Sequence, residues 1–450
     1  MQYQEYNLKR NNMLVNRPYR TSYQVIRIVV LLFLLSMASV GYAIDKITSD
    51  GLTYSVMHGN RLMLSIDSYG GTELIVPDTV WYEGEAFPVV QISVSESIES
   101  NNLERIRLPQ TVEEVKRLSE SYVSHNIFWK CSSLKNIEVA EENKWLCSED
   151  GVLFSKDKTE LFAVPAAKEG IYMMPETVTE IHNEAFSGCK FLAEVYVSKN
   201  ATSLGCSVFR NCLGLKRIVI PQGLLSIGDR AFEGTSIESI VLPEGIEEIG
   251  HSWFADCKMK SMIVPEGVKT IGQSAFSDCY NLESITLPNT ITTIGENAFS
   301  GCTQLSSITI GDNVTSIGSL AFFACYHLTS VTIPKNVTYI GYDVFRYCVN
   351  LKSVIIESMD IDAYKELFDV LLYQGIGMID VHVHKDIIEK AKSMYSGTIL
   401  SIEDYETGIS HVPTAVRDSE ERLYDLQGRR LKAVPQRGMY IRNGRKYVVK

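Results

Sequence analysis

The chain repeats itself eight times in succession between residues 175 and 356. Each copy is 22 or 23 residues long, and "PNTITTIGENAFSGCTQLSSITI", residues 288 to 310, is representative. A phenylalanine stands at one position of every copy, and a cysteine stands three residues later in seven of them. A fixed period of this length is the signature of a solenoid, in which each coil contacts only its neighbours.

The apolar positions of one copy predict the elements of one coil. "LSSITI" alternates, which predicts a short strand, and "ITTIG" predicts a second extended piece closed by a glycine turn. "ENAFSGC" predicts one helical or 3-10 turn with its apolar side chains in the interior. The inward positions of this copy are Ile291, Ile294, Ala298, Phe299, Cys302, Leu305, Ile308 and Ile310. We therefore expect a mainly β solenoid with short helical turns and a parallel β-sheet along one side.

The strand pattern, as in Leu282, Ile285 and Leu287, is the signature of leucine-rich repeats. The fuller pattern "VTxIGxxAFxxC" resembles the BspA-like leucine-rich repeats of bacterial surface proteins, and the resemblance covers all eight copies. It implies a non-catalytic protein that adheres to host or bacterial macromolecules through the solenoid face. An envelope scaffold or a glycan-capture accessory protein without an adhesive role is the alternative.

The segments on either side of the repeats have other patterns. Residues 44–174 contain three hairpin patterns and repeat-like strands, which predict an N-terminal cap with degenerate repeats. Residues 357–402 predict a capping segment in which the strand "MIDVHVH" lies between two helices, "DAYKELFDVLLYQ" and "KDIIEKAKSMY". Residues 403–420 are polar and aperiodic, as is typical of a linker.

Residues 1–43 have the pattern of a signal peptide. Basic residues precede the apolar run "IVVLLFLLSMASV", and the small residues Gly41 and Ala43 follow it. The run is shorter than the roughly 20 residues of a transmembrane helix. We expect a mature chain that begins near Ile44 and is exported to the cell surface, the outer membrane or the medium; an uncleaved anchor is the alternative.

Residues 421–450 form a basic tail with nine Lys and Arg against two acidic residues. Asn443-Gly444 between alternating strands predicts a two-residue β-hairpin. "YDLQGRRL", then "GMYI" and a basic end, resemble an abbreviated C-terminal sorting signal of type IX secretion cargo. The resemblance implies surface attachment through the envelope secretion machinery, and a small terminal β-module of another purpose is the alternative.

The sequence predicts no catalytic residue, no cofactor and no nucleic-acid partner. It contains no nucleophile elbow, P-loop, dinucleotide fingerprint or HExxH motif, and its net charge of −11 is opposite to the clustered basic charge that phosphate binding needs. His382 and His384 form an HxH motif that Asp380 or Asp386 would complete as a metal site. Such pairs are usually incidental, so we predict no metal site.

The ten cysteines raise the question of disulfides or structural zinc. Seven of them share one inward repeat position: Cys189, Cys212, Cys257, Cys279, Cys302, Cys325 and Cys348. Neighbouring coils would bring such residues into disulfide range, and an exported chain meets oxidising conditions. Packing explains one small apolar residue at one inward position, so we expect a ladder of reduced thiols. Zinc needs paired ligands at short spacing, and the chain has no CxxC.

The outward positions of the predicted strands are where a partner, an extracellular protein or glycan, would bind. In the later copies these positions form columns of small hydroxyl side chains, and in the earlier copies they are more varied. The candidate binding residues are Ser284, Thr286, Ser307, Thr309, Ser330 and Thr332 in the columns, and Glu194, Tyr196 and Arg217 in the earlier copies. A solvated sheet surface that merely tolerates Ser and Thr explains the hydroxyl columns equally well.

Overall fold

The structure is a computed structural model. It describes residues 46–94, 97–117, 124, 126–360 and 379–395, with the backbone of strands at 400–404, 423–424, 430–431, 438–442 and 445–449. The predicted signal peptide and the predicted helix "DAYKELFDVLLYQ" lie outside the described residues. Among the described residues, no helix has the length and apolar character needed to cross a membrane.

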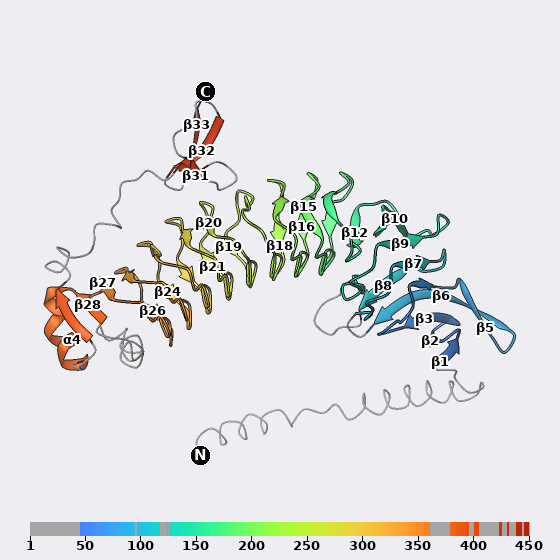
Figure 1. Ribbon diagram of the computed structural model, residues 1–450, viewed down its shortest axis with the longest axis horizontal. Helices are drawn as coiled ribbons and strands as arrows, with labels where there is room; N and C mark the ends of the chain where they lie inside the picture. Colours follow the sequence, from blue (N-terminus) through green and yellow to red (C-terminus); the bar gives the residue numbers. More distant parts are fainter. Residues whose placement is uncertain are drawn as a thin grey trace, which may run out of the picture.

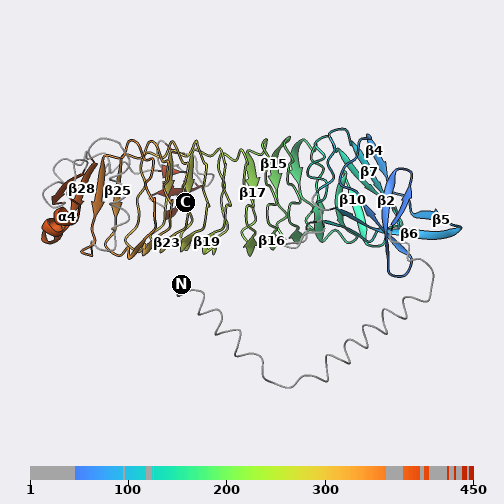
Figure 2. The same cartoon turned by 90° about the horizontal axis from the view of Figure 1, so that it is seen from below.

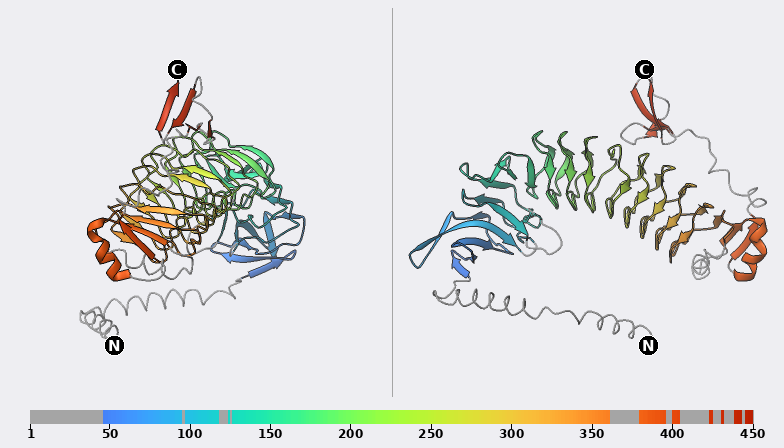
Figure 3. Two further views of the ribbon diagram at one scale, coloured as in Figure 1. Left: turned by 60° about the vertical axis from the view of Figure 1, so that its left-hand side comes forward. Right: turned by 180° about the vertical axis from the view of Figure 1, so that it is seen from behind.

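The repeats stack side by side into an arched solenoid, with a β-rich cap at the N-terminal end and helix α4 (Ile388–Tyr395) at the other (Figures 1 and 3). Short strands dominate, and the mainly β solenoid predicted from the repeats is confirmed. The strands form two rows, one along each side of the coils. In Figure 2, β15, β25 and β28 lie in one row and β16, β19 and β23 in the other.

The first row consists of parallel strands that lie one to a coil. Its strands are β13 (Gly170–Met173), β15 (Leu192–Tyr196), β17 (Arg217–Val219), β20 (Ser261–Ile263), β22 (Ser284–Thr286), β25 (Ser330–Ile333), β27 (Ser353–Ile356), β28 (Ile379–Val383) and β29 (Leu400–Asp404). They form three separate ladders, β13-β15-β17, β20-β22 and β25-β27-β28-β29. Because β29 reaches Asp404, the first two residues of the predicted linker, 403–420, belong to a strand.

Two predicted strands of this row are not formed: residues 237–242, which make only an isolated bridge between Ser239 and Arg217, and "LSSITI", residues 305–310. Leu305, Ile308 and Ile310 are buried as the alternation in "LSSITI" predicts, but the segment has no strand pairing with either neighbouring coil. Alternation predicts which side chains are buried. A ladder also requires the neighbouring backbone within hydrogen-bonding distance, and this segment is held by its inward packing instead.

The second row consists of parallel strands in two separate ladders, which the sequence predicted only as isolated extended pieces. Its strands are β14 (Glu180–Ile181), β16 (Ser203–Leu204), β18 (Ser226–Ile227), β19 (Glu248–Ile249), β21 (Thr270–Ile271), β23 (Thr293–Ile294), β24 (Ser316–Ile317) and β26 (Tyr339–Ile340). The glycine that follows extends the ladder, since the Gly295 N–H donates to the Ile271 carbonyl at 2.7 Å. The solenoid therefore has parallel pairing on two sides rather than one.

The turn between the rows is not helical, so the helical or 3-10 turn predicted from "ENAFSGC" is wrong. Residues two before and two after the repeat phenylalanine have positive φ, such as Asn297 at 55° and Gly301 at 74°. These left-handed residues direct N–H groups at the next coil, and the Phe299 N–H likewise donates to the Ala321 carbonyl at 2.8 Å. A helix would keep these bonds within its own segment. The turns instead form a third ladder between coils.

The repeats share one continuous core cluster that runs along the coils from Val152 to Ala391, and a second cluster, from Ile47 to Ala163, fills the cap. The eight repeat phenylalanines are fully buried, and the rings of Phe299 and Phe322 stack with centroids 5.4 Å apart and planes 5° apart. The repeat cysteines lie beside these phenylalanines, and their thiols are free. The Cys302 thiol donates to the Phe276 carbonyl of the preceding coil at 3.1 Å.

The N-terminal cap combines hairpins with irregular coils. Its strands are β1 (Lys46–Ser49), β2 (Leu52–Met57), β3 (Arg61–Ser65), β4 (Glu73–Ile75), β5 (Thr79–Tyr82), β6 (Glu85–Val94), β7 (Arg105–Leu108), β8 (Glu114–Arg117), β9 (Asn136–Val139), β10 (Leu146–Glu149), β11 (Val152–Ser155) and β12 (Glu160–Ala163). The pairs β2/β3, β5/β6 and β10/β11 are antiparallel hairpins at the three predicted places. The ladder β4-β7-β9 is parallel, like the coils that follow.

The predicted end segments also contain strands and a helix. "KDIIEKAKSMY" forms a 3-10 turn, η2 (Lys385–Ile387), that continues into α4, and β28 pairs in parallel with β27. The basic tail has more strands than the predicted hairpin. Its strands β30 (Leu423–Tyr424), β31 (Arg430–Leu431), β32 (Gly438–Arg442) and β33 (Arg445–Val449) form an antiparallel sheet.

Candidate functional site

The first row brings three of the predicted binding residues together at its N-terminal ladder. β15 and β17 pair with Glu194 opposite Arg217, and Tyr196 opposite Val219. The Tyr196 hydroxyl donates to Glu194 Oε2 at 3.0 Å, and an Arg217 guanidinium nitrogen lies 3.7 Å from the same carboxylate oxygen. The Arg217 guanidinium also lies over the Tyr196 ring, 5.8 Å from its centroid. The three side chains therefore form one connected surface group.

Large apolar side chains surround this group and are exposed to solvent. β13 places Ile171 opposite Glu194 and Met173 opposite Tyr196, and these two side chains are 61% and 73% exposed. On the other side, Val219 and Val241 are 38% and 44% exposed. We call this surface the β13–β17 patch: Ile171, Met173, Glu194, Tyr196, Arg217, Val219 and Val241.

The sequence predicted only part of this patch. Ile171 and Met173 were missed because they precede the first regular copy, although "GIYMMP" ends in proline as several later repeat strands do. Inward and outward side chains alternate along this strand as they do in the later repeat strands. Tyr172 is buried between Ile171 and Met173, and burial raises the pKa of its hydroxyl. A search for the strand pattern upstream of the first full copy is therefore the signal that would have found both residues.

The hydroxyl columns lie on the same row, but their side chains are of types that contribute little binding energy to an interface. Ser284 and Thr286 lie beside β20, and Ser330 and Thr332 lie beside β27. All four are at least partly exposed, and so are Ser307 and Thr309, which lie in the segment without ladder bonds. Ser and Thr are under-represented among the residues that dominate binding energy. The structure therefore places these six candidates outward, and their apolar neighbours are only the partly exposed Ile263 opposite Thr286 and Ile355 opposite Thr332.

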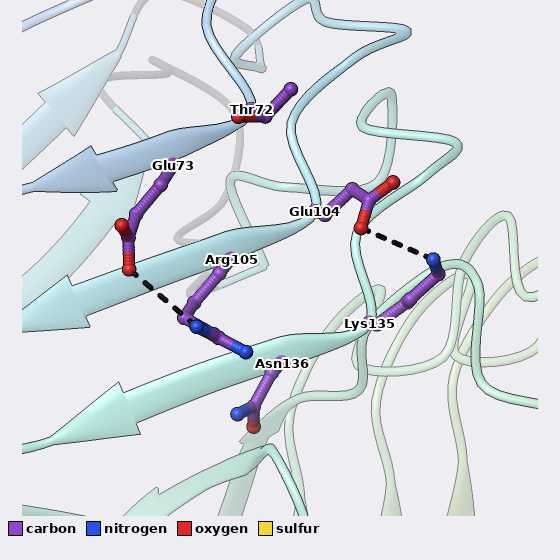
Figure 4. A pocket seen from close by; sticks show the side chains of 6 residues that line it. All are labelled: Thr72, Glu73, Glu104, Arg105, Lys135 and Asn136. Carbon is purple, nitrogen blue, oxygen red and sulfur yellow. Dashed lines mark hydrogen bonds and ion pairs between the residues drawn. The ribbon is translucent and has the colours of Figure 1, made fainter.

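An open cavity of about 210 Å³ lies over the ladder β4-β7-β9 of the cap (Figure 4). Its lining residues are Thr72, Glu73, Glu104, Arg105, Lys135 and Asn136. Lys135 lies 3.2 Å from Glu104, and Arg105 lies 3.8 Å from Glu73 and 3.1 Å from Glu138. Carboxylates face both cations, so the cavity suits a neutral polar ligand better than an anion.

The two histidines of the HxH motif have different surroundings. His382 lies in β28 and is 8% exposed, whereas His384 lies beyond the strand and caps η2. The His384 Nδ1 accepts from the Asp386 N–H at 3.2 Å. Within the described part of the chain, the only trio of His, Cys, Asp or Glu whose ligand atoms converge is Glu160, Glu180 and His182.

The repeats match a known family. The family described as "BspA type Leucine rich repeat region" matches in six copies, over residues 170–283 and 247–370. No curated protein matches the chain significantly.

Solved structures of leucine-rich repeat proteins are similar to this chain. A leucine-rich cell surface protein from Faecalibacterium prausnitzii is 21% identical, with 73% of this chain and 98% of that chain covered and a TM-score of 0.41. A leucine-rich repeat protein from Eubacterium ventriosum is 20% identical, with coverage of 61% and 93% and a TM-score of 0.42. One from Bacteroides ovatus is 22% identical, with coverage of 75% and 100% and a TM-score of 0.38.

Proposed function

From the BspA-type leucine-rich repeats of residues 170–370, we propose that this chain is an exported, non-catalytic binding protein. It adheres to a protein of its surroundings through the β13–β17 patch. The family match is to a repeat region and not to an enzyme family. Repeat solenoids commonly use their extended surface for binding, and their shared core leaves the ligand to surface detail.

The observation that supports this proposal is the exposure of Met173 and Val219 beside Tyr196 and Arg217. Contiguous exposed apolar surface rimmed by polar groups marks interaction sites on soluble proteins. Met, Tyr and Arg are enriched at the centres of protein–protein interfaces, and Tyr and Arg are enriched among the residues that dominate binding energy. The patch has this composition, whereas the hydroxyl columns do not.

The adhesion proposal is tested by binding of the purified protein to arrays of matrix proteins and glycans. We expect saturable binding to at least one matrix protein that survives moderate salt, because apolar contacts are not screened by ions. An array on which no protein binds saturably would refute the adhesive role.

Export and surface attachment form a separate part of the proposal, supported by the apolar N-terminal run and the basic tail, residues 421–450. Protease treatment of intact cells tests it. We expect the chain to be digested from outside, and a chain that lacks residues 421–450 to be lost from the surface. Protection of the full chain in intact cells would contradict export, and unchanged display of the shortened chain would contradict the role of the tail.

Glycan capture is a second candidate because of the polar cavity over β4-β7-β9. A neutral sugar would find Asn136 and the paired charges of Arg105 and Lys135 as hydrogen-bonding groups there. If this role holds, an Asn136→Ala change abolishes glycan binding on the array and leaves matrix-protein binding unchanged. Glycan binding that survives this change would exclude the cavity.

A further inference from the structure

One residue breaks the glycine column of the second row. Seven copies have glycine after the second strand, and the first copy has His182. Glycine is required in the later coils because a Cβ at Gly295 would lie 2.7 Å from the carbonyl carbon of Gly272 in the coil below. The first copy follows the inserted hairpin instead of a regular coil, so its position accepts a side chain. The imidazole packs on the Phe162 ring at a centroid distance of 4.8 Å.

Two carboxylates converge on this imidazole. β12 and β14 pair in parallel with Glu160 opposite Glu180, which places both side chains at the same level of the ladder. The His182 Nε2 lies 2.7 Å from Glu160 Oε2 and 3.8 Å from Glu180 Oε1. The three ligand atoms all lie within 4.8 Å of one another. The His182 side chain is 17% exposed, so solvent can reach the group. Packing on the Phe162 ring fixes the position of the imidazole.

We propose that Glu160, Glu180 and His182 bind one zinc ion. One imidazole nitrogen with two carboxylate oxygens is a donor set that zinc accepts, with water as the fourth ligand. Tetrahedral zinc at about 2.0–2.2 Å from each donor places the donors roughly 3.3 Å apart. The observed separations of 2.7 and 3.8 Å lie on either side of that value. The third separation, between the two glutamate oxygens, is at most 4.8 Å, so these carboxylates would approach each other by up to about 1.5 Å to complete the site.

The ion would stabilise the junction between β12 and the first regular repeat. Glu160 belongs to β12, which pairs with β11 of the inserted hairpin, whereas Glu180 and His182 belong to the first regular copy. Zinc at this point would therefore add a link between two segments that strand pairing, flanking backbone hydrogen bonds and a shared core already join. A ligand that binds only the folded chain stabilises it by mass action.

The test is calorimetric titration of the purified, chelator-treated protein with zinc chloride, together with thermal melts with and without the metal. We expect about one zinc ion per chain and a melting temperature that rises with zinc. The His182→Gly variant restores the residue of the other seven copies. It is expected to fold with a metal-free melting temperature somewhat lowered by the lost Phe162 contact, to show no rise in melting temperature with zinc, and to bind zinc at least tenfold more weakly.

Two further variants identify the site. Glu160→Gln removes a charged ligand at nearly constant shape, and we expect it also to weaken binding at least tenfold. His58→Ala, in the exposed turn between β2 and β3, and His384→Ala are matched controls that should bind zinc like the unaltered protein. Absence of a saturable zinc signal, or the same affinity and stoichiometry in His182→Gly as in the unaltered protein, would overturn the proposal.

Discussion

At the scale of single residues, the repeat cysteines have two roles that a sequence pattern does not separate. Each fills a small inward site, and most also donate a hydrogen bond to a carbonyl of the preceding coil, as Cys279 does to Phe254 at 2.9 Å. Thr235, which replaces the cysteine in one copy, also donates, but its hydroxyl bonds the Phe232 carbonyl of its own coil at 2.8 Å. The position therefore selects for a small side chain with a donor. Packing alone would equally have allowed alanine or valine.

A Cys302→Ala change tests this double role. The variant loses the buried sulfur and leaves the Phe276 carbonyl without its thiol donor, so we expect the free energy of unfolding to fall by about 1–3 kcal/mol. Urea denaturation measures it. Cys206→Ala is the control, because Cys206 is partly exposed and outside the repeat column, and it should cost less than about 0.5 kcal/mol. Equal losses in both variants would contradict the argument.

The buried thiols of the repeats, and that of Cys131 in the cap, predict a sensitivity to alkaline pH. Burial raises the pKa of Cys131 and of Cys348 to about 12, whereas thiols of an unfolded chain ionise near pH 8.5. Unfolding between these values releases protons, so the stability present below the lower value is lost as pH rises through this window. We expect the urea midpoint of the reduced protein to fall between about pH 9 and pH 11. The fall should be shallower in Cys348→Ala, and an identical slope in that variant would argue against the thiols as its source.

At the scale of elements, the three ladders differ in how far the sequence predicts them. Alternation in strands such as β22 predicts the buried face and the outward columns of the first row. The turn ladder depends on backbone with positive φ, and side chains as unlike as Leu320, Ala324 and Tyr347 adopt it. Six of the eight residues two after the repeat phenylalanine are Gly, Asn or Asp, which favour this conformation, whereas the residues two before it give no consistent signal. The hydrogen bonds to the next coil outweigh the conformational cost of the positive φ. These bonds exist only in the stacked coils, so a single copy of the sequence does not predict them.

The glycine column makes a sharp prediction for the second row. In Gly295→Ala the new Cβ would meet backbone atoms of Gly272 and Gln273 at 2.7 and 2.9 Å, so neighbouring coils must separate. We expect a loss of about 1–3 kcal/mol in the free energy of unfolding. Gly223→Ala is the matched control, because its Cβ would have no neighbour within 4 Å. A Gly295→Ala protein as stable as Gly223→Ala would show that the coils are not packed this closely.

At the scale of the whole molecule, the repeat period predicted which residues would meet across coils. A spacing of 23 residues places Glu194 beside Arg217, and the register of β15 and β17 confirms that pairing. The rest of the β13–β17 patch depends on Ile171 and Met173, which precede the first full copy. The convergence of Glu160 with His182 was equally hidden, because it depends on how an inserted hairpin joins the stack. Long-range contacts within the periodic region were thus predictable, whereas those at its boundary were not.

Binding through the β13–β17 patch is the central claim, and surface plasmon resonance with the matrix protein that binds most tightly on the array tests it most directly. The variant Met173→Lys/Val219→Lys places charge on the exposed apolar part of the patch. The control Leu225→Lys makes the same kind of change on the other strand row, where Leu225 is 84% exposed. We predict at least tenfold weaker binding by the double variant and unchanged binding by the control. Unchanged binding by the double variant, or an equal loss in the control, would contradict the account.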